Sequence, residues 1–139
     1  MSRSNYSEDL EPWALIRWRG AVASAIRGAR GQAFLREMLA AVDTITDKRL
    51  VADVLEADGE VCAIGAVGRA RGIGMAELDP EEPEDVARVF GIPRALAAEI
   101  VYENDEGAWR ETPEQRWRRM RDWIVSHLRP GSTEDAPSE

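Results

Sequence analysis

Apolar residues recur at helical spacing along most of this 139-residue chain, and this spacing restricts the fold more than any other feature. In QAFLREMLAAVDTI the positions three or four residues apart are Phe34, Leu35, Met38, Leu39, Val42 and Ile45. Such spacing places them on one face of a helix. An earlier stripe in WALIRWRGAVASAI is formed by Trp13, Ile16, Ala23 and Ile26. Because Gly28 and Gly31 lie between the two segments, we expect two helices, or one helix kinked at RGARG.

Two further segments carry signals of local structure. Thr112-Pro113-Glu114-Gln115 supplies a cap hydroxyl, a first-turn proline and a glutamine three residues on, a capping-box pattern that begins a helix running to about His127. LVADVLEADGEV is rich in Val and Leu and contains the turn pair Asp58-Gly59, which predicts a short β-hairpin near residues 50–61. We therefore predict a mainly α fold, a single compact helical domain of about five or six helices with this hairpin.

The two ends of the chain differ from its middle in composition. Residues 1–11 are expected to form a flexible arm, and residues 130–139, PGSTEDAPSE, have the proline, serine and acid content of a disordered acidic tail. Residues 12–129 are expected to form the helical domain. No apolar run approaches the roughly 20 residues of a transmembrane helix, and the N-terminus lacks the apolar segment of a signal peptide. We expect a cytoplasmic protein with no membrane partner.

The run GEVCAIGAVGRARGIG, residues 59–74, holds five of the eleven glycines and raises the question of phosphate binding. A phosphate-binding loop needs a lysine after its glycines, but the only lysine, Lys48, lies upstream. The spacing does not match a dinucleotide fingerprint either. Gly65, Gly68 and Gly72 instead fall close to one face of a helix, where a neighbouring helix can approach closely. The run therefore predicts close packing, and no cofactor is expected.

Charge is distributed unevenly along the chain, whose net charge is −8. Residues 77–106 hold ten acidic residues against two arginines, whereas arginine is in excess from residue 107 to residue 129. The candidate partner-binding residues on the far side of the terminal helix are Arg118, Arg119 and Arg129. Such a face can meet an acidic protein surface or a phosphate backbone, although basic faces are more often only solvated. The acidic segment raises a further alternative, an acidic DNA-mimic inhibitor.

The segment EPEDVARVFGIPRALAAEIVYEN has the spacing of a helix-turn-helix, with the turn at Gly91. In that alternative the second helix exposes Arg94, Ala95, Ala98, Glu99 and Tyr102. Only Arg94 in this set is positive, and Glu99 and Glu103 would repel phosphates. Nucleic acid is therefore disfavoured as a partner, and a helical hairpin within the core is the preferred interpretation.

Catalytic and metal-binding residue sets are sparse. Cys62 is the only cysteine and His127 the only histidine, so no Cys/His zinc site can be assembled, and a cation at a helix end suffices to explain His127. Whether Glu99, Glu103 and Asp105 hold a cation is left open by the sequence. We predict that the protein is not an enzyme and has no catalytic, cofactor or metal residues.

Four blocks of sequence in residues 13–125 carry a resemblance. They are IRWRGAVASAIRGARGQAFLREMLAAVD, ADGEVCAIGAVGRARGI, FGIPRALAAEIVYENDEG and ETPEQRWRRMRDWI. In this order they resemble a group of small uncharacterised proteins encoded by phages and prophages of proteobacteria. The resemblance implies a phage or prophage setting inside a host bacterial cell, and it assigns no functional residue. We therefore predict a non-enzymatic accessory protein that binds a host macromolecule, in first place a protein such as a defence component.

Overall fold

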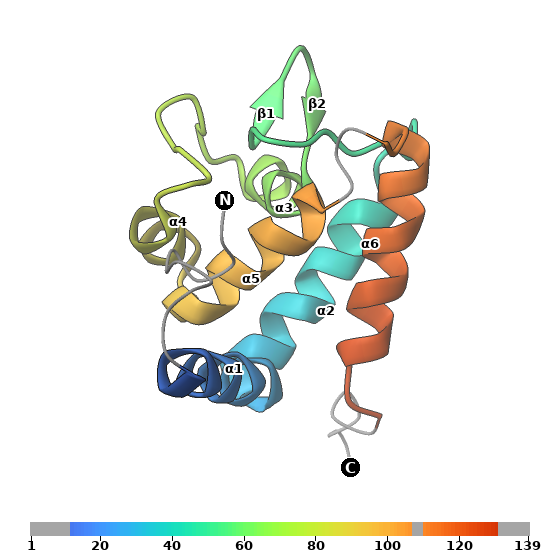
Figure 1. Cartoon of the computed structure of the whole chain (residues 1–139). Helices are drawn as coiled ribbons and strands as arrows, with labels where there is room; N and C mark the ends of the chain where they lie inside the picture. The colour runs from blue at the N-terminus through green and yellow to red at the C-terminus, as the bar shows by residue number, and fades with distance from the viewer. Residues whose placement is uncertain (1–11, 107–109, 131–139) are drawn as a thin grey trace.

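The computed structural model describes residues 12–106 and 110–130, which form six helices and one hairpin (Figure 1). The helices are α1 (Pro12–Arg27), α2 (Ala29–Asp43), α3 (Ala63–Arg71), α4 (Pro83–Phe90), α5 (Arg94–Asp105) and α6 (Pro113–His127). Strands β1 (Glu56–Ala57) and β2 (Glu60–Val61) are antiparallel, with Glu56 opposite Val61. The predicted mainly α domain with a short hairpin is confirmed. The expected arm, residues 1–11, and the expected tail from residue 131 onward lie outside the described residues.

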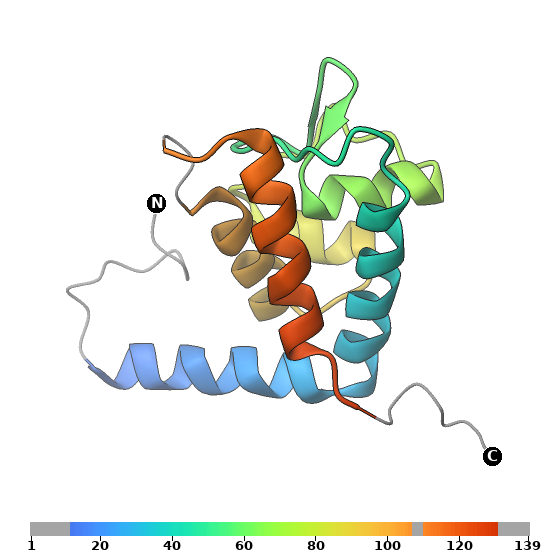
Figure 2. The ribbon, with the colours of Figure 1, turned by 90° about the vertical axis from the view of Figure 1, so that its right-hand side faces the viewer.

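Helix α5 lies in the middle of the molecule. Its residues Leu96, Ala97 and Ile100 have no exposed surface, and α5 contacts α1, α3, α4 and α6. Figures 1 and 2 both show α1 crossing one end of the molecule, with the hairpin at the opposite end. None of the described helices is both long and apolar enough to cross a membrane.

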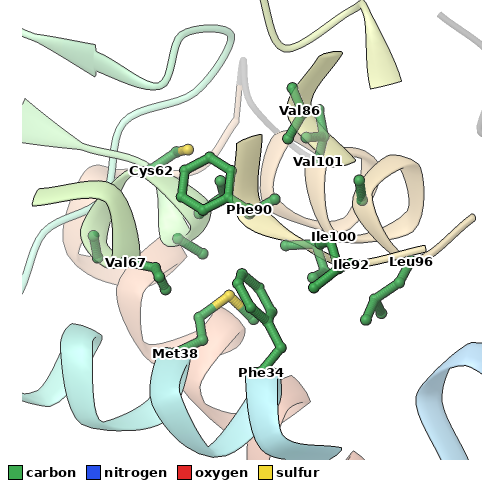
Figure 3. Close-up of a cluster of buried hydrophobic side chains, with 14 of the residues drawn as sticks. Phe34, Met38, Cys62, Val67, Val86, Phe90, Ile92, Leu96, Ile100 and Val101 are labelled. Carbon is green, nitrogen blue, oxygen red and sulfur yellow. The ribbon is translucent and has the colours of Figure 1, made fainter. Parts of the chain in front are cut away.

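The core is built from apolar side chains of the central helices (Figure 3). Phe34 of α2 and Phe90 of α4 meet edge to face, with ring centroids 6.2 Å apart and an interplanar angle of 76°, an arrangement that aromatic pairs prefer. Met38, one helical turn after Phe34 on the same face of α2, is fully buried. The apolar stripe predicted for the second helix therefore faces the core.

The junction between α1 and α2 depends on glycine. The chain turns sharply between Arg27 and Ala29 (Figure 2), so the RGARG segment separates two helices. A Cβ on Gly31 would lie 1.8 Å from the carbonyl oxygen of Ala25, far closer than atoms can approach. The turn therefore requires the absence of a side chain at this position.

The glycine run forms α3 and packs closely, as predicted. A Cβ on Gly65 would lie 2.0 Å from the carbonyl oxygen of Leu55, and one on Gly68 would lie 2.3 Å from the sulfur of Met75. The close neighbours are mainly loops before β1 and after α3 rather than one facing helix. The sequence also predicts Gly72 on this packing face, which is wrong, because Gly72 ends the helix as a left-handed cap with φ 76°.

Two local signals of the sequence are present in the structure. Asp58 and Gly59 have φ values of 53° and 82°, the positive values that a tight two-residue hairpin turn requires. At the start of α6, Thr112 Oγ1 accepts a hydrogen bond from the Gln115 N–H at 3.0 Å, and Gln115 Oε1 accepts one from the Thr112 N–H at 2.9 Å. The predicted hairpin and capping box are thus both formed.

Candidate functional site

The three arginines predicted to bind a partner have different surroundings. Arg118 is exposed. Arg119 donates hydrogen bonds to the carbonyl oxygens of Glu103 and Glu106 at 2.7 and 2.8 Å, and its guanidinium pairs with Glu111 at 2.5 Å. Arg129 donates to the carbonyl oxygen of Arg27 at 3.1 Å. Arg119 and Arg129 therefore donate hydrogen bonds to the backbone of other segments of the fold.

The helix pair α4–α5 is present, with Gly91 at the turn in a left-handed conformation of φ 71°. The surface predicted for nucleic-acid reading is not exposed as expected, because Ala98 and Glu99 are only 8% and 7% exposed. The other members of the set, Arg94, Ala95 and Tyr102, are half-buried. The expectation fails because α5 is the central helix and α1 covers the side on which Glu99 lies.

The acidic residues near the end of α5 do not come together as a cation site. Glu99 lines a cavity beside α1, whereas Glu103 lines a separate hollow beside α6. Asp105 accepts a hydrogen bond from the backbone N–H of Asp53 at 3.0 Å, and burial raises the pKa of its carboxyl group. Among residues 12–106 and 110–130, no three His, Cys, Asp or Glu side chains are grouped so that they could hold a metal ion.

The single cysteine and the single histidine both make hydrogen bonds at the ends of helices. Cys62 caps α3, where its sulfur accepts a hydrogen bond from the Gly65 N–H at 3.3 Å, and burial raises the pKa of its thiol to about 12. A thiol with that pKa is protonated at neutral pH and is a poor nucleophile. His127 donates from Nδ1 to the carbonyl oxygen of Trp123 at 2.8 Å, in the last turn of α6.

An apolar hollow lies where α1, α5 and α6 meet, and we call it the α1 cavity. It has a volume of about 310 Å³. Helix α1 contributes six lining residues, Trp18, Arg19, Val22, Ala23, Ile26 and Arg27, to which α5 adds Glu99 and α6 adds His127. Because residues from distant parts of the sequence form it, the cavity exists only in the folded chain.

The α1 cavity is mainly apolar, and Trp18, which lines it, carries a buried polar atom. Trp18 is only 6% exposed, and its buried Nε1–H has no acceptor in the described part of the chain. Buried donors are paired in the great majority of cases because an unpaired one costs free energy. Arg19 and Arg27 are exposed at the rim. The Nε1–H itself is closed to solvent, so the cavity offers an inserted group mainly apolar contacts.

Exposed apolar side chains occur on the same helix. Trp13, Leu15 and Ile16 in the first half of α1 are 62%, 44% and 58% exposed. Scattered single apolar residues are normal on a surface, but clustered ones mark interaction sites. The charged residues of α1 are Arg17, Arg19 and Arg27, and the helix has no acidic residue. The outer side of α1 is therefore apolar and basic on a chain whose net charge is −8.

The face of α1 that is buried differs from the one predicted. The expected stripe contained Trp13, Ile16, Ala23 and Ile26, but only Ile26 is buried, together with Trp18 and Val22. Trp18, Val22 and Ile26 also recur every four residues, so periodicity alone permitted both stripes. The sequence signal that could have indicated the burial of Glu99 is its position within the apolar stretch RALAAEIV. No sequence pattern predicted that His127 would lie beside α1.

The chain matches no protein-family model, no curated protein and no solved structure.

Proposed function

We propose that this is a non-enzymatic binding protein that docks a protein partner on the outer side of α1. The observation that carries the proposal is the exposure of Trp13 and Ile16, at 62% and 58%, beside arginines on the same helix. Tryptophan and arginine are enriched among the residues that dominate binding energy in protein interfaces. An exposed tryptophan offers a large apolar area that a partner can bury.

The α1 cavity supports binding rather than a bond-breaking reaction. Val22, Ala23 and Ile26 give it an apolar lining, which can desolvate an inserted group. In the phage or prophage setting that the sequence resemblance implies, the partner would be a host protein such as a defence component. The docking surface proposed here is α1, in place of Arg118, Arg119 and Arg129, because Arg119 and Arg129 donate hydrogen bonds within the fold.

A nucleic acid is the alternative partner for the same surface, because Arg17, Arg19 and Arg27 could contact phosphates and Trp13 could stack on a base. The net charge of −8 opposes that alternative. A salt series separates the two, since phosphate contacts release counterions and weaken steeply as salt rises. Binding of short duplex or single-stranded DNA that weakens steeply with salt would favour the nucleic acid.

The proposal is tested by substituting an exposed apolar residue on α1 and a matched one elsewhere. Trp13→Glu should reduce capture of a partner from a proteobacterial host lysate by about 30-fold, the effect of losing a hot-spot residue worth about 2 kcal/mol. Val54→Glu is the control, because Val54 is 39% exposed and lies two residues before β1 of the hairpin. Figure 1 shows the hairpin at the opposite end of the molecule from α1. Equal capture by wild type and both variants would contradict docking on α1.

A further inference from the structure

We propose further that the partner presents an acidic amphipathic helix to α1 and inserts one apolar side chain of that helix into the α1 cavity beside Trp18. This inference rests on the proposed function and adds the chemistry of the partner. The size of the cavity, its apolar lining and the charges at its rim support it.

The size of the α1 cavity suits one large side chain. Its volume of about 310 Å³ is at the lower end of the range of roughly 300 to 1,000 Å³ that small-molecule sites occupy. The floor is formed by Val22 and Ile26, which are each 9% exposed, and by the half-buried Ala23. A helix that lies in such a groove inserts its apolar residues at i, i+3 or i+4 positions. The exposed Leu15 and Ile16 extend the apolar surface for the next turns of that helix.

Trp18 lines the cavity with a side chain that is only 6% exposed. Its Nε1 atom is buried away from solvent, so the contact open to an inserted side chain is the apolar part of the indole ring. An apolar side chain seated against that ring would change its surroundings, which makes the indole N–H signal of Trp18 a reporter of insertion.

The charges at the rim indicate the sign of the partner. Arg19 and Arg27 are eight residues apart, which is about 12 Å along a helix, and both are exposed at the edge of the cavity. Among the described residues, Glu99 is the only acidic one in the lining. Carboxylates about two turns apart on a partner helix would therefore meet the two guanidinium groups, which bind carboxylates in a two-pronged geometry.

A second copy of this chain fits the surface less well. Packing α1 against α1 of another copy would place Arg17, Arg19 and Arg27 opposite the same arginines, and like charges in contact are unfavourable. The acidic segment of residues 77–85 has the right sign, but among those residues only Pro83, Glu84 and Asp85 are helical.

The experiment uses two synthetic peptides of about 18 residues, five helical turns. Both have leucine at i, i+3, i+4 and i+7 positions; one has glutamate on the flanking positions and the other has lysine there. Each is titrated into the ¹⁵N-labelled full chain while the indole N–H signal of Trp18, identified by its loss in Trp18→Phe, is followed. The glutamate peptide should shift this signal saturably, and the lysine peptide should bind at least tenfold more weakly.

Two variants sharpen the result. Arg19→Glu/Arg27→Glu should reverse the preference, so that the lysine peptide binds more tightly. Ala23→Phe should fill the cavity and weaken the glutamate peptide without removing either arginine, and it tests the cavity even if Trp18→Phe fails to fold. Equal binding of both peptides by the wild type would overturn the charge argument. Binding of the glutamate peptide with no change at Trp18 and no effect of Ala23→Phe would overturn the anchor.

These outcomes are distinguishable from failure of the proposed function. If Trp13→Glu abolishes partner capture while neither peptide binds, α1 is a docking surface but the partner is not an acidic helix, and this inference is overturned alone. If sedimentation shows self-association that Arg19→Glu removes, the occupant is a second copy, which also overturns the inference. If Trp13→Glu leaves partner capture intact, docking on α1 itself is contradicted.

Discussion

Individual glycines in this fold have different structural roles. The Cβ of an alanine at Gly65 would meet the backbone carbonyl of Leu55 at 2.0 Å, whereas at Gly68 it would meet the flexible side chain of Met75 at 2.3 Å. At Gly20, in the middle of α1, it would meet nothing within 4 Å. A backbone atom cannot move aside as a thioether can. The same glycine-to-alanine substitution should therefore destabilise the fold strongly at Gly65, less at Gly68, and not at Gly20.

Alanine substitutions at these glycines should separate those roles. Gly65→Ala should lower the free energy of unfolding by about 3 kcal/mol and Gly68→Ala by about 1 kcal/mol, the range of overpacking costs. Gly20→Ala should raise it by about 0.5 to 1 kcal/mol, because alanine is the better helix former. Urea denaturation of the three variants provides the measurement. A Gly65→Ala variant as stable as wild type would show that α3 does not approach Leu55 this closely.

The helices hold one another through their ends as well as through their apolar faces. Arg119 of α6 donates to three carbonyl oxygens at the end of α5, those of Glu103, Asn104 and Glu106. Carbonyl groups at a helix C-terminus have no partners within the helix, and the guanidinium group supplies several donors in a fixed plane. Arg119 therefore joins α5 to α6, and its neighbour Arg118 serves as an exposed comparison on the same helix.

Charge reversal at the two neighbouring arginines should have unequal effects. Arg119→Glu should lower the free energy of unfolding by about 2 kcal/mol or more, because hydrogen bonds from a charged group are worth about 1.5 to 3 kcal/mol. Arg118→Glu should change it by less than about 0.5 kcal/mol. Thermal or urea denaturation checks both values. Equal effects of the two substitutions would contradict the role of Arg119 at the end of α5.

Elements of the fold were more predictable than the surroundings of particular side chains. The capping box at Thr112 and the turn at Asp58-Gly59 are set by residues close in sequence, so local rules sufficed for them. Arg116 is different: it is 3% exposed and donates to the carbonyl oxygen of Leu50, 66 residues away, at 3.1 Å. Burial of an arginine depends on such distant acceptors, which periodicity does not reveal. The same reason explains why the α1 cavity could not be predicted, since Trp18, Glu99 and His127 meet only through packing.

Over the whole molecule, ion pairs between distant elements couple stability to pH. Hydrogen bonds from Arg119 lower the pKa of Glu111, those from Arg121 lower the pKa of Asp43, and those from Arg71 lower the pKa of Glu37. A carboxyl group whose pKa is lower in the folded state stabilises the fold fully above its unfolded pKa of about 4. That contribution is lost as the pH falls from there through the folded pKa. Burial of Asp105 has the opposite sign, because it raises the pKa.

Glu111→Gln and Asp105→Asn should therefore shift stability in opposite directions at pH 7. Glu111→Gln should lower the free energy of unfolding by about 2 kcal/mol, and its difference from wild type should close below about pH 4. Asp105→Asn should raise the free energy of unfolding, since an amide oxygen can still accept from the Asp53 N–H without the cost of a buried charge. The stability difference between Asp105→Asn and wild type should disappear at a higher pH than that of Glu111→Gln, between the raised folded pKa of Asp105 and about 4.

Urea midpoints measured from pH 7 down to about 2.5 test both signs, with Glu77→Gln as the control for loss of one negative charge at an exposed position. The stability difference from wild type should disappear below about pH 4 for Glu111→Gln and above about pH 4 for Asp105→Asn. The reason is that the folded pKa of Glu111 lies below its unfolded value, whereas that of Asp105 lies above it. If both variants change stability in the same direction and in parallel with Glu77→Gln, the effect comes from net charge alone. The contacts of Glu111 and Asp105 would then make no specific contribution to the pH dependence of folding.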